Sequence, residues 1–245
     1  MGEARLILRH APAGVVAGFP STGTAISLDA ALRLRSVGNC GSTSGCLAVG
    51  SAQFADTGSD AYVSWGRWTG NSIAVNSSTP NTPLAANRSL HYLVGAPTVT
   101  MPTSGVFTYG LLGATSATVS DGSMAPGSFK GTAVVHFAPA TQTRVGLEAQ
   151  VTMSNGQYNF STPGGLGNAS RSGMAMDSRN TFSGELQTQP NAGSGSFNCG
   201  ASRCRVEVQG GFFGPDAARL GLGYSIVDPS NAGRSISGVG VLERK

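Results

Sequence analysis

The 245-residue chain has little charge, since Asp, Glu, Lys and Arg make up 11% of it, less than half of the usual share. Aromatic residues reach only 7%. No stretch approaches the roughly 20 apolar residues of a membrane helix. Low charge also argues against disorder, because disordered chains carry more charge and fewer β-branched and aromatic residues. These scarcities favour a folded chain without membrane-spanning helices.

Lysine is nearly absent as well. Lys130 and Lys245 are the two lysines of the chain, so its net charge of +4 comes almost wholly from arginine. The arginines are scattered and no cluster of aromatic residues accompanies them, whereas nucleic-acid binding proteins carry a basic patch or stripe. We therefore expect a solvated basic surface and no nucleic-acid partner.

The motifs of common enzymes are missing. A serine hydrolase has serine at the centre of a Gly-x-Ser-x-Gly turn, whereas residues 41–45 have Thr43 there. There is no phosphate-binding loop of the Gly-x-x-x-x-Gly-Lys type, and the acidic residues offer no pair for glycoside chemistry. Glu148 and Glu207 lie in strand-like segments and are expected on the wet face. The sequence predicts no catalytic residue, no cofactor and no enzymatic activity.

Histidine is too rare for a convincing metal site. With three histidines in the chain, His91 and His136 have no third ligand near them in the sequence. Both fall in strand-like segments, and we expect both on the surface and no metal site.

The four cysteines form two close pairs. Cys40 and Cys46 bracket residues 41–45, and Cys199 and Cys204 bracket residues 200–203. Neither pair has the C-x-x-C spacing of redox and zinc motifs. We predict two local structural disulfides and hence an oxidising compartment, the alternative being free thiols in a cytosolic protein.

An exported chain raises the question of a signal peptide. The apolar run Leu6-Ile7-Leu8 is too short for one and is interrupted by Arg9-His10. We expect the sequence to be a mature or truncated form of a longer precursor.

What the chain has in abundance is glycine, with 36 residues, together with many Ser and Thr. Such a composition is typical of short strands joined by many turns. About ten segments read as strands: 61–68, 90–94, 106–112, 129–137, 145–153, 158–161, 181–188, 204–208, 222–226 and 236–242. In 129–137 and 145–153 apolar and polar residues alternate, so one face is buried and one is wet. Asn155-Gly156 is a strong hairpin turn.

These patterns predict an all-β fold, an antiparallel soluble β-barrel of eight strands or nearly eight, over residues 51–245. Closure into a barrel removes exposed edges. A membrane-spanning barrel is the alternative, but it needs longer strands and aromatic girdles. Residues 1–50 are of uncertain structure, either the end of a preceding domain or added strands. Within them, residues 32–37 suggest a strand, whereas Ser27 could begin a helix.

One short helical turn is predicted near the C-terminus, over residues 214–221. Pro215 stands at the first helical position, where its missing N–H costs nothing, and Asp216 lies in the first turn. Gly221 is placed for a left-handed C-terminal cap.

Two groups of residues resemble known families. The segment 211–221, Gly-Phe-Phe-Gly-Pro-Asp-Ala-Ala-Arg-Leu-Gly, and the ending 237–242 resemble the barrel domains of transferrin-binding-protein-B-like bacterial surface proteins. The segments 65–68, 90–95 and 105–113 are similar to the barrel region that follows a FecR-type domain in Gram-negative envelope proteins. Together they cover about residues 60–245. No loop residues match those that hold transferrin, so the resemblance does not extend to that partner.

The resemblance implies an exported, non-enzymatic binding module in the periplasm or on the outer-membrane surface of a Gram-negative bacterium. It would hold a protein or small ligand through its loops, in nutrient uptake such as that of iron or haem. Any membrane association would come from a lipid anchor that this chain does not contain. The alternative function is a structural or signalling C-terminal barrel of an envelope regulator, without a ligand of its own.

Overall fold

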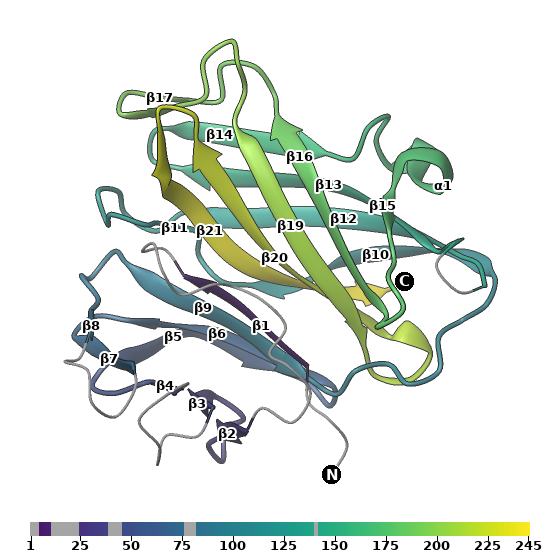
Figure 1. Ribbon diagram of the computed structural model, residues 1–245, viewed down its shortest axis with the longest axis horizontal. Helices are drawn as coiled ribbons and strands as arrows, with labels where there is room; N and C mark the ends of the chain where they lie inside the picture. Colours follow the sequence, from purple (N-terminus) through teal and green to yellow (C-terminus); the bar gives the residue numbers. More distant parts are fainter. Residues whose placement is uncertain (1–4, 11–24, 39–45, 76–81, 140–141) are drawn as a thin grey trace.

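The computed structural model describes residues 5–10, 25–38, 46–75, 82–139 and 142–245. Within these ranges the chain is mainly β-structure, arranged in four antiparallel sheets (Figure 1). The helical elements are short and comprise η2 (Leu166–Asn168), α1 (Ala169–Ser172) and η3 (Pro215–Ala217). None of the described helices is both long and apolar enough to cross a membrane.

Eight strands of the described part close into an antiparallel barrel, as predicted. In sheet order they are β10 (Gly105–Ala114), β12 (Ser128–Phe137), β13 (Arg144–Met153), β14 (Gly156–Ser161), β16 (Thr181–Thr188), β19 (Arg205–Phe213), β20 (Arg219–Asp228) and β21 (Asn231–Arg244). The barrel closes because β10 pairs with β12 on one side and with β21 on the other. Two short strands extend the sheet, β11 (Thr118–Val119) beside β21 and β15 (Met174–Ala175) beside β13.

The barrel interior is filled by side chains. The predicted inward sets of β12 and β13 are buried, and large aromatic side chains from other strands join them. Tyr109, Tyr158, Tyr224 and Phe212 are fully buried in this core. A barrel of eight strands is just wide enough for such a filling.

Two glycines make room for an aromatic stack in this core. The rings of Phe129 and Tyr224 stack with their centroids 5.0 Å apart. Gly238 and Gly240 of β21 lie against them, and a Cβ at Gly240 would come within 2.8 Å of the Phe129 ring. A Cβ at Gly238 would meet the Tyr224 hydroxyl. These two positions therefore require glycine for close approach.

The N-terminal part adds two further sheets. One is ordered β1-β9-β6-β5 and the other β2-β3-β4-β7-β8. The strands of the first are β1 (Arg5–His10), β9 (Ser89–Gly95), β6 (Val63–Thr69) and β5 (Gln53–Ser59). Those of the second are β2 (Ile26–Leu28), β3 (Leu34–Val37), β4 (Leu47–Ala48), β7 (Ser72–Val75) and β8 (Thr82–Pro83).

The four-stranded sheet is a middle layer. As Figure 1 shows, it lies between the barrel and the five-stranded sheet of short strands, which we call the small sheet. One of its faces buries Trp68 against the small sheet, and the Trp68 indole donates to the Leu34 carbonyl at 2.9 Å. Its other face packs Trp65 against Val239 and Val241 on the outside of β21. The two tryptophans thus point to opposite faces, as their spacing predicts, and both faces are covered.

This layering corrects the prediction for residues 53–95. The segments 61–68 and 90–94 were expected in the barrel, but they form β6 and β9 of the middle sheet, β7 and β8 belong to the five-stranded sheet, and the barrel sheet begins at Gly105. Both β6 and β9 are buried nearly throughout, because each has a partner layer on either side. Continuous burial leaves no alternating pattern that could assign a strand to one sheet or another.

His91 is also a correction. It is fully buried, with its two ring nitrogens 2.9 Å from the Thr115 hydroxyl and 2.8 Å from the Thr118 hydroxyl. His91 lies on β9 of the middle layer. The side of β9 that we expected to face water faces the barrel part instead. His136 is half-buried on the outer face of β12.

Other local expectations are resolved. β2 and β3 confirm strands rather than a helix from Ser27. The helical turn at Pro215 is present as η3, but Gly221 lies inside β20 and caps nothing. The hairpin turn between β13 and β14 is at Ser154-Asn155, one residue earlier than predicted.

An ion pair and a carboxylate hydrogen bond tie the middle sheet to the barrel part. Arg219 of β20 donates to Asp60 at 2.6 Å. Burial alone would raise the pKa of the Asp60 carboxyl, but hydrogen bonds from the Tyr62 N–H and Arg219 outweigh it and hold the pKa below its ordinary value. Asp56 has a lowered pKa for the same reason, since its Oδ2 accepts from Arg67 and from the Ser116 N–H.

The Tyr224 hydroxyl finds no hydrogen-bond partner among the described residues, whereas the Tyr109 hydroxyl donates to the Ala217 carbonyl at 2.8 Å. Because an unpaired buried hydroxyl costs free energy, we expect Tyr224→Phe to raise the free energy of unfolding by up to about 1 kcal/mol. The matched Tyr109→Phe should lower it by about 1 to 2 kcal/mol. Urea denaturation of both variants measures this, and an equal loss in both would contradict it.

The Asp60–Arg219 pair predicts a loss of stability in acid. Because the pKa of Asp60 is lowered in the folded state, its contribution is full above the unfolded pKa of about 3.9 and is lost as the pH falls through the folded pKa. Urea denaturation at pH 5 and at pH 3 measures this, since the two values span the unfolded pKa of about 3.9. Between them, the free energy of unfolding should fall less in Asp60→Asn and in Arg219→Gln than in the parent protein. The same loss in all three proteins would show that the pair does not matter.

Candidate binding groove

The barrel carries a hollow on its outer face, with a volume of about 680 Å³. It lies over β12, β13 and β14 and extends to the connection that follows β16. The lining residues are Lys130, Gly131, Thr132, Glu148, Ala149, Gln150, Asn159, Phe160, Ser161, Gln187, Thr188, Gln189, Pro190 and Arg203. We call this hollow the groove.

The short strand β14 shapes the groove. It has 6 residues where β12 and β13 have 10, and it pairs with β16 through two residue pairs, Phe160↔Thr188 and Ser161↔Gln187. Beyond Ser161 the chain leaves the sheet and forms η2 and α1, which contact β13. The connection after β16 carries a small hairpin, β17 (Gly193–Ser194) and β18 (Phe197–Asn198), at the end of the barrel (Figure 1).

Polar side chains on the groove floor stand in two rows that run across the strands. The first, which we call the amide row, consists of Lys130, Gln150, Asn159 and Gln189. The second row consists of Thr132, Glu148, Ser161 and Gln187. Neighbours in a row lie on adjacent strands, about 4.8 Å apart, and the rows are two residues apart along each strand, about 7 Å.

Hydrogen bonds hold the middle of the amide row. The Gln150 amide nitrogen donates to the Asn159 side-chain oxygen at 2.7 Å and to Gln157 at 3.2 Å. Gln189 accepts from the Asn159 N–H at 2.5 Å and donates to the Gln157 carbonyl at 3.0 Å. The Gln150 oxygen and the Asn159 amide nitrogen have no partner among the described residues, so they remain available to a ligand.

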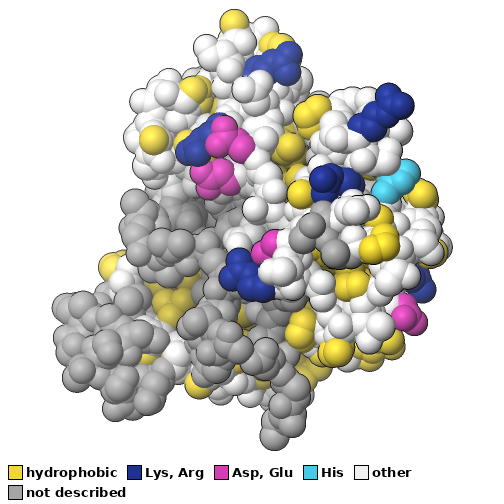
Figure 2. Space-filling view, turned by 45° about the vertical axis from the view of Figure 1, so that its right-hand side comes forward, with side chains coloured by type: hydrophobic (Ala, Val, Ile, Leu, Met, Phe, Trp, Pro, Cys, Tyr) yellow, Lys and Arg dark blue, Asp and Glu magenta, His cyan; other side chains and the backbone are white. Residues whose placement is uncertain are grey.

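The charges of the groove are unequal. Within the described residues, Lys130 and Arg203 make neither a hydrogen bond through their charged groups nor an ion pair. The one carboxylate, Glu148, accepts a hydrogen bond from the Leu166 N–H at 3.2 Å. Figure 2 shows one face of the molecule on which charged side chains are few and several acidic side chains lie against basic ones.

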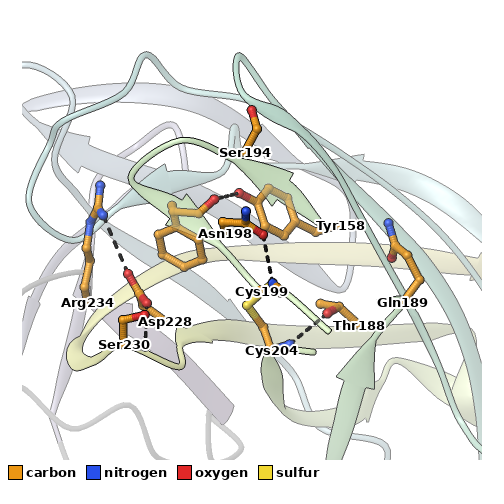
Figure 3. The surroundings of a disulfide bond; sticks show 12 residues. Tyr158, Thr188, Gln189, Ser194, Asn198, Cys199, Cys204, Asp228, Ser230 and Arg234 are labelled. Carbon is orange, nitrogen blue, oxygen red and sulfur yellow. Dashed lines mark hydrogen bonds and ion pairs between the residues drawn. A yellow bond between two sulfur atoms is a disulfide. The ribbon is translucent and has the colours of Figure 1, made fainter. Parts of the chain in front are cut away.

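The predicted disulfide Cys199–Cys204 is present and adjoins the groove. Thr188 lies next to Cys204 (Figure 3), and its hydroxyl accepts from the Cys204 N–H at 2.9 Å. Arg203 precedes Cys204 and has a φ of 62°, in the left-handed region that a side chain with Cβ rarely adopts. The disulfide thus fixes both an edge of the groove and the backbone of its arginine.

The hairpin at the end of the barrel is also well anchored. Phe197 is fully buried, packs edge-on to Tyr158 at a centroid distance of 5.7 Å, and accepts from the Tyr158 hydroxyl at 2.9 Å. Arg234 lies over the Phe197 ring and pairs with Asp121 at 2.7 Å. Burial would raise the pKa of Asp121, but hydrogen bonds from Ser123 and the charge of Arg234 lower it. This end of the barrel is covered by packed side chains rather than open to a ligand.

The remaining predicted residues are placed as follows. Cys46 is buried, and its predicted partner Cys40 lies outside the described residues, so that disulfide stays a prediction. Glu148 and Glu207 are exposed, as predicted, and Glu148 belongs to the groove while Glu207 pairs with Arg205. In the described ranges no three His, Cys, Asp or Glu side chains lie close enough to hold a metal ion.

Sequence reasoning did not find the groove. Its residues stand at outward positions of strands, where polar side chains are ordinary. The sequence feature that could have indicated the groove is that four of these positions carry side-chain amides: Gln150, Asn159, Gln187 and Gln189. That they form rows depends on strand register, which a single sequence does not reveal.

Comparison with known proteins gives structural likenesses only. No family model matches the chain, and no curated protein matches its sequence. Among solved structures, a mutant of the vaccine antigen transferrin binding protein B from Haemophilus parasuis Hp5 is similar, with 16% identity and a TM-score of 0.44. The isotype 1 transferrin binding protein B of serogroup B Neisseria meningitidis has 13% identity and a TM-score of 0.48.

Both likenesses cover 99% of this chain but 45% and 43% of those structures, so the chain spans less than half of their length. They are proteins of the group that the sequence resemblance named. The barrel itself rests on the strand pairing described above, and the association with FecR-type domains stays a prediction.

The disulfide predicts a measurable stabilisation. Replacing both Cys199 and Cys204 by Ser should lower the free energy of unfolding by about 2 kcal/mol, because the unfolded chain regains the freedom of the closed loop. Urea denaturation without reductant measures this. The control is Ser202→Ala in the same loop, which should change it by less than about 0.5 kcal/mol. No difference between the two variants would contradict the prediction.

Proposed function

We propose that this chain is a non-enzymatic binding module of a Gram-negative cell envelope and that the groove is its binding surface. One observation carries the proposal. The groove floor presents two cross-strand rows of polar side chains whose hydrogen-bonding capacity is only partly used. Binding sites are concave and place a small number of polar groups to fix a ligand's orientation.

The filled barrel supports a site on the outer wall rather than inside. Tyr109, Tyr158 and Tyr224 occupy the interior, and Phe197 closes one end. On the wall, by contrast, most polar side chains of the groove project from paired strands, whose neighbours set their direction. A site on such rigid elements loses little freedom on binding.

The disulfide supports the proposed location. Cys199–Cys204 is a bond that persists in oxidising compartments, among them the periplasm and the bacterial surface. The resemblance stated for residues 211–221 and 237–242 adds the Gram-negative envelope, and uptake of a nutrient such as iron or haem as the process. The partner is a protein or a small ligand held at the groove.

A structural or signalling barrel without a ligand is the second candidate. The close filling of the interior and the anchored hairpin favour it, since both give a rigid, closed body. It does not account for the unpaired Lys130 and Arg203 in one hollow.

Capture from cell envelope separates the two functions. The immobilised oxidised protein is incubated with solubilised envelope and with medium fractions, and retained molecules are identified by mass spectrometry. We expect a saturable partner that the double variant Gln150→Ala, Asn159→Ala fails to retain, because it loses the centre of the amide row. The matched control, Gln53→Ala with Ser183→Ala, changes exposed polar side chains outside the groove and should retain the partner. Equal retention by all three proteins would exclude the groove as the site.

A further inference from the structure

The amide row and the second row have the chemistry to recognise a hydroxyl-rich ligand. Side-chain amides both donate and accept, and so do hydroxyl groups. Along the floor, the free Gln150 oxygen is an acceptor, the free Asn159 amide nitrogen is a donor, and Gln187 offers both without a partner in the described residues. Each hydroxyl of such a ligand can donate to an acceptor of the floor or accept from a donor, so the free polar groups of the floor can all be paired.

The spacing of the rows fits a chain of sugar units. A ligand lying across the strands meets one side chain of each row about every 4.8 Å, the distance between neighbouring strands. This repeat is close to the length of one hexopyranose unit in an extended glycan. Gly131 and Ala149 lie between the rows on two adjacent strands and face each other in register. Both stand at inward positions of their strands, and the Ala149 side chain lies in the barrel core, so the floor between the two rows is backbone, on which a sugar ring can lie.

The floor is less suited to a protein partner. Binding energy between proteins comes mostly from aromatic, Arg and large apolar anchors in dry pockets. The one aromatic residue of the groove, Phe160, is 3% exposed and points into the barrel core. Its lining therefore offers no exposed aromatic or large apolar side chain around which a protein interface forms.

The charged side chains of the groove narrow the class of ligand further. Lys130 and Arg203 are unpaired, while Glu148 is engaged by the backbone of Leu166. The groove therefore has two cationic side chains without an ion-pair partner and one carboxylate that already accepts a hydrogen bond. This balance of charge is complementary to a ligand that carries carboxylates. Arg203 lies at the edge of the groove, in the loop that the Cys199–Cys204 disulfide closes.

We propose that the groove binds an acidic oligosaccharide, which lies across β12, β13 and β14 and reaches the connection after β16. Its hydroxyls bond to the amide row and the second row, and its carboxylates pair with Lys130 and Arg203. This inference rests on the proposed function, since it names the ligand class of the same groove.

Titration calorimetry with defined oligosaccharides tests the inference. The acidic probes are tetramers of galacturonate and of sialic acid, and the neutral probe is the tetramer of galactose. We expect at least one acidic tetramer to bind about tenfold more tightly than the neutral one, since two exposed ion pairs contribute up to about 1 kcal/mol each. The preference should weaken as the salt concentration rises.

Variants assign the binding to the groove. Lys130→Gln with Arg203→Gln should abolish the acidic preference and leave the weaker neutral binding. Gln150→Ala with Asn159→Ala should weaken both. The matched control is Arg171→Gln, which removes an unpaired cation on α1 outside the groove and should change nothing. Circular dichroism and thermal unfolding of each variant show that it is folded.

Two results would overturn the inference. One is that no acidic tetramer binds to the folded protein, and the other is that acidic and neutral tetramers bind equally. If no sugar binds but the Gln150→Ala, Asn159→Ala variant still loses an envelope partner in the capture experiment, the groove remains a binding site and the ligand class is wrong. If neither experiment depends on the groove, both proposals fail.

Discussion

The fold depends on the antiparallel pairing of β21 with β10, which joins the last strand to the first and closes the sheet. Closure removes two edges whose unpaired N–H and C=O groups would attract another chain. β21 also carries Gly238 and Gly240 against the aromatic stack on its inner side, and Val239 and Val241 against the middle sheet on its outer side. β21 therefore closes the barrel, leaves room for the aromatic core and holds the N-terminal part. At these positions its inward residues must be small to fit the aromatic rings, and its outward residues must be apolar to pack against the middle sheet.

Closure and filling together leave the outside of the barrel as the surface for the proposed binding. An interior packed with rings has no room for a ligand, and the eight strands pair in sequence round the barrel, most weakly between β14 and β16. What remains is the outer surface, which is flat unless a strand is cut short. β14 is short, and the connections on either side of it turn the wall into a hollow. The groove is thus a consequence of one strand's length, while the rigidity of its floor comes from the barrel beneath it.

Much of the barrel could be predicted from the sequence, because period-2 alternation reports a strand with one buried face. Phe129 to Phe137 and Val145 to Met153 are such strands, and their inward faces are those expected. The middle sheet could not be assigned, since strands covered on both sides show no alternation, and His91 was misplaced for that reason. The Cys199–Cys204 bond follows from close spacing in the chain, whereas the groove follows from register between strands distant in sequence.

In a chain with so little charge, the position of an unpaired charge is more informative than the net charge. Several arginines are used within the fold: Arg67 and Arg219 hold aspartates where the middle sheet meets the barrel, and Arg234 holds the hairpin. Lys130 and Arg203 have no such role in the described residues, and a structural constraint keeps Arg203 in a backbone conformation that is costly for a side chain with Cβ. A glycine at that position would relieve the cost, so the fold itself does not require an arginine there.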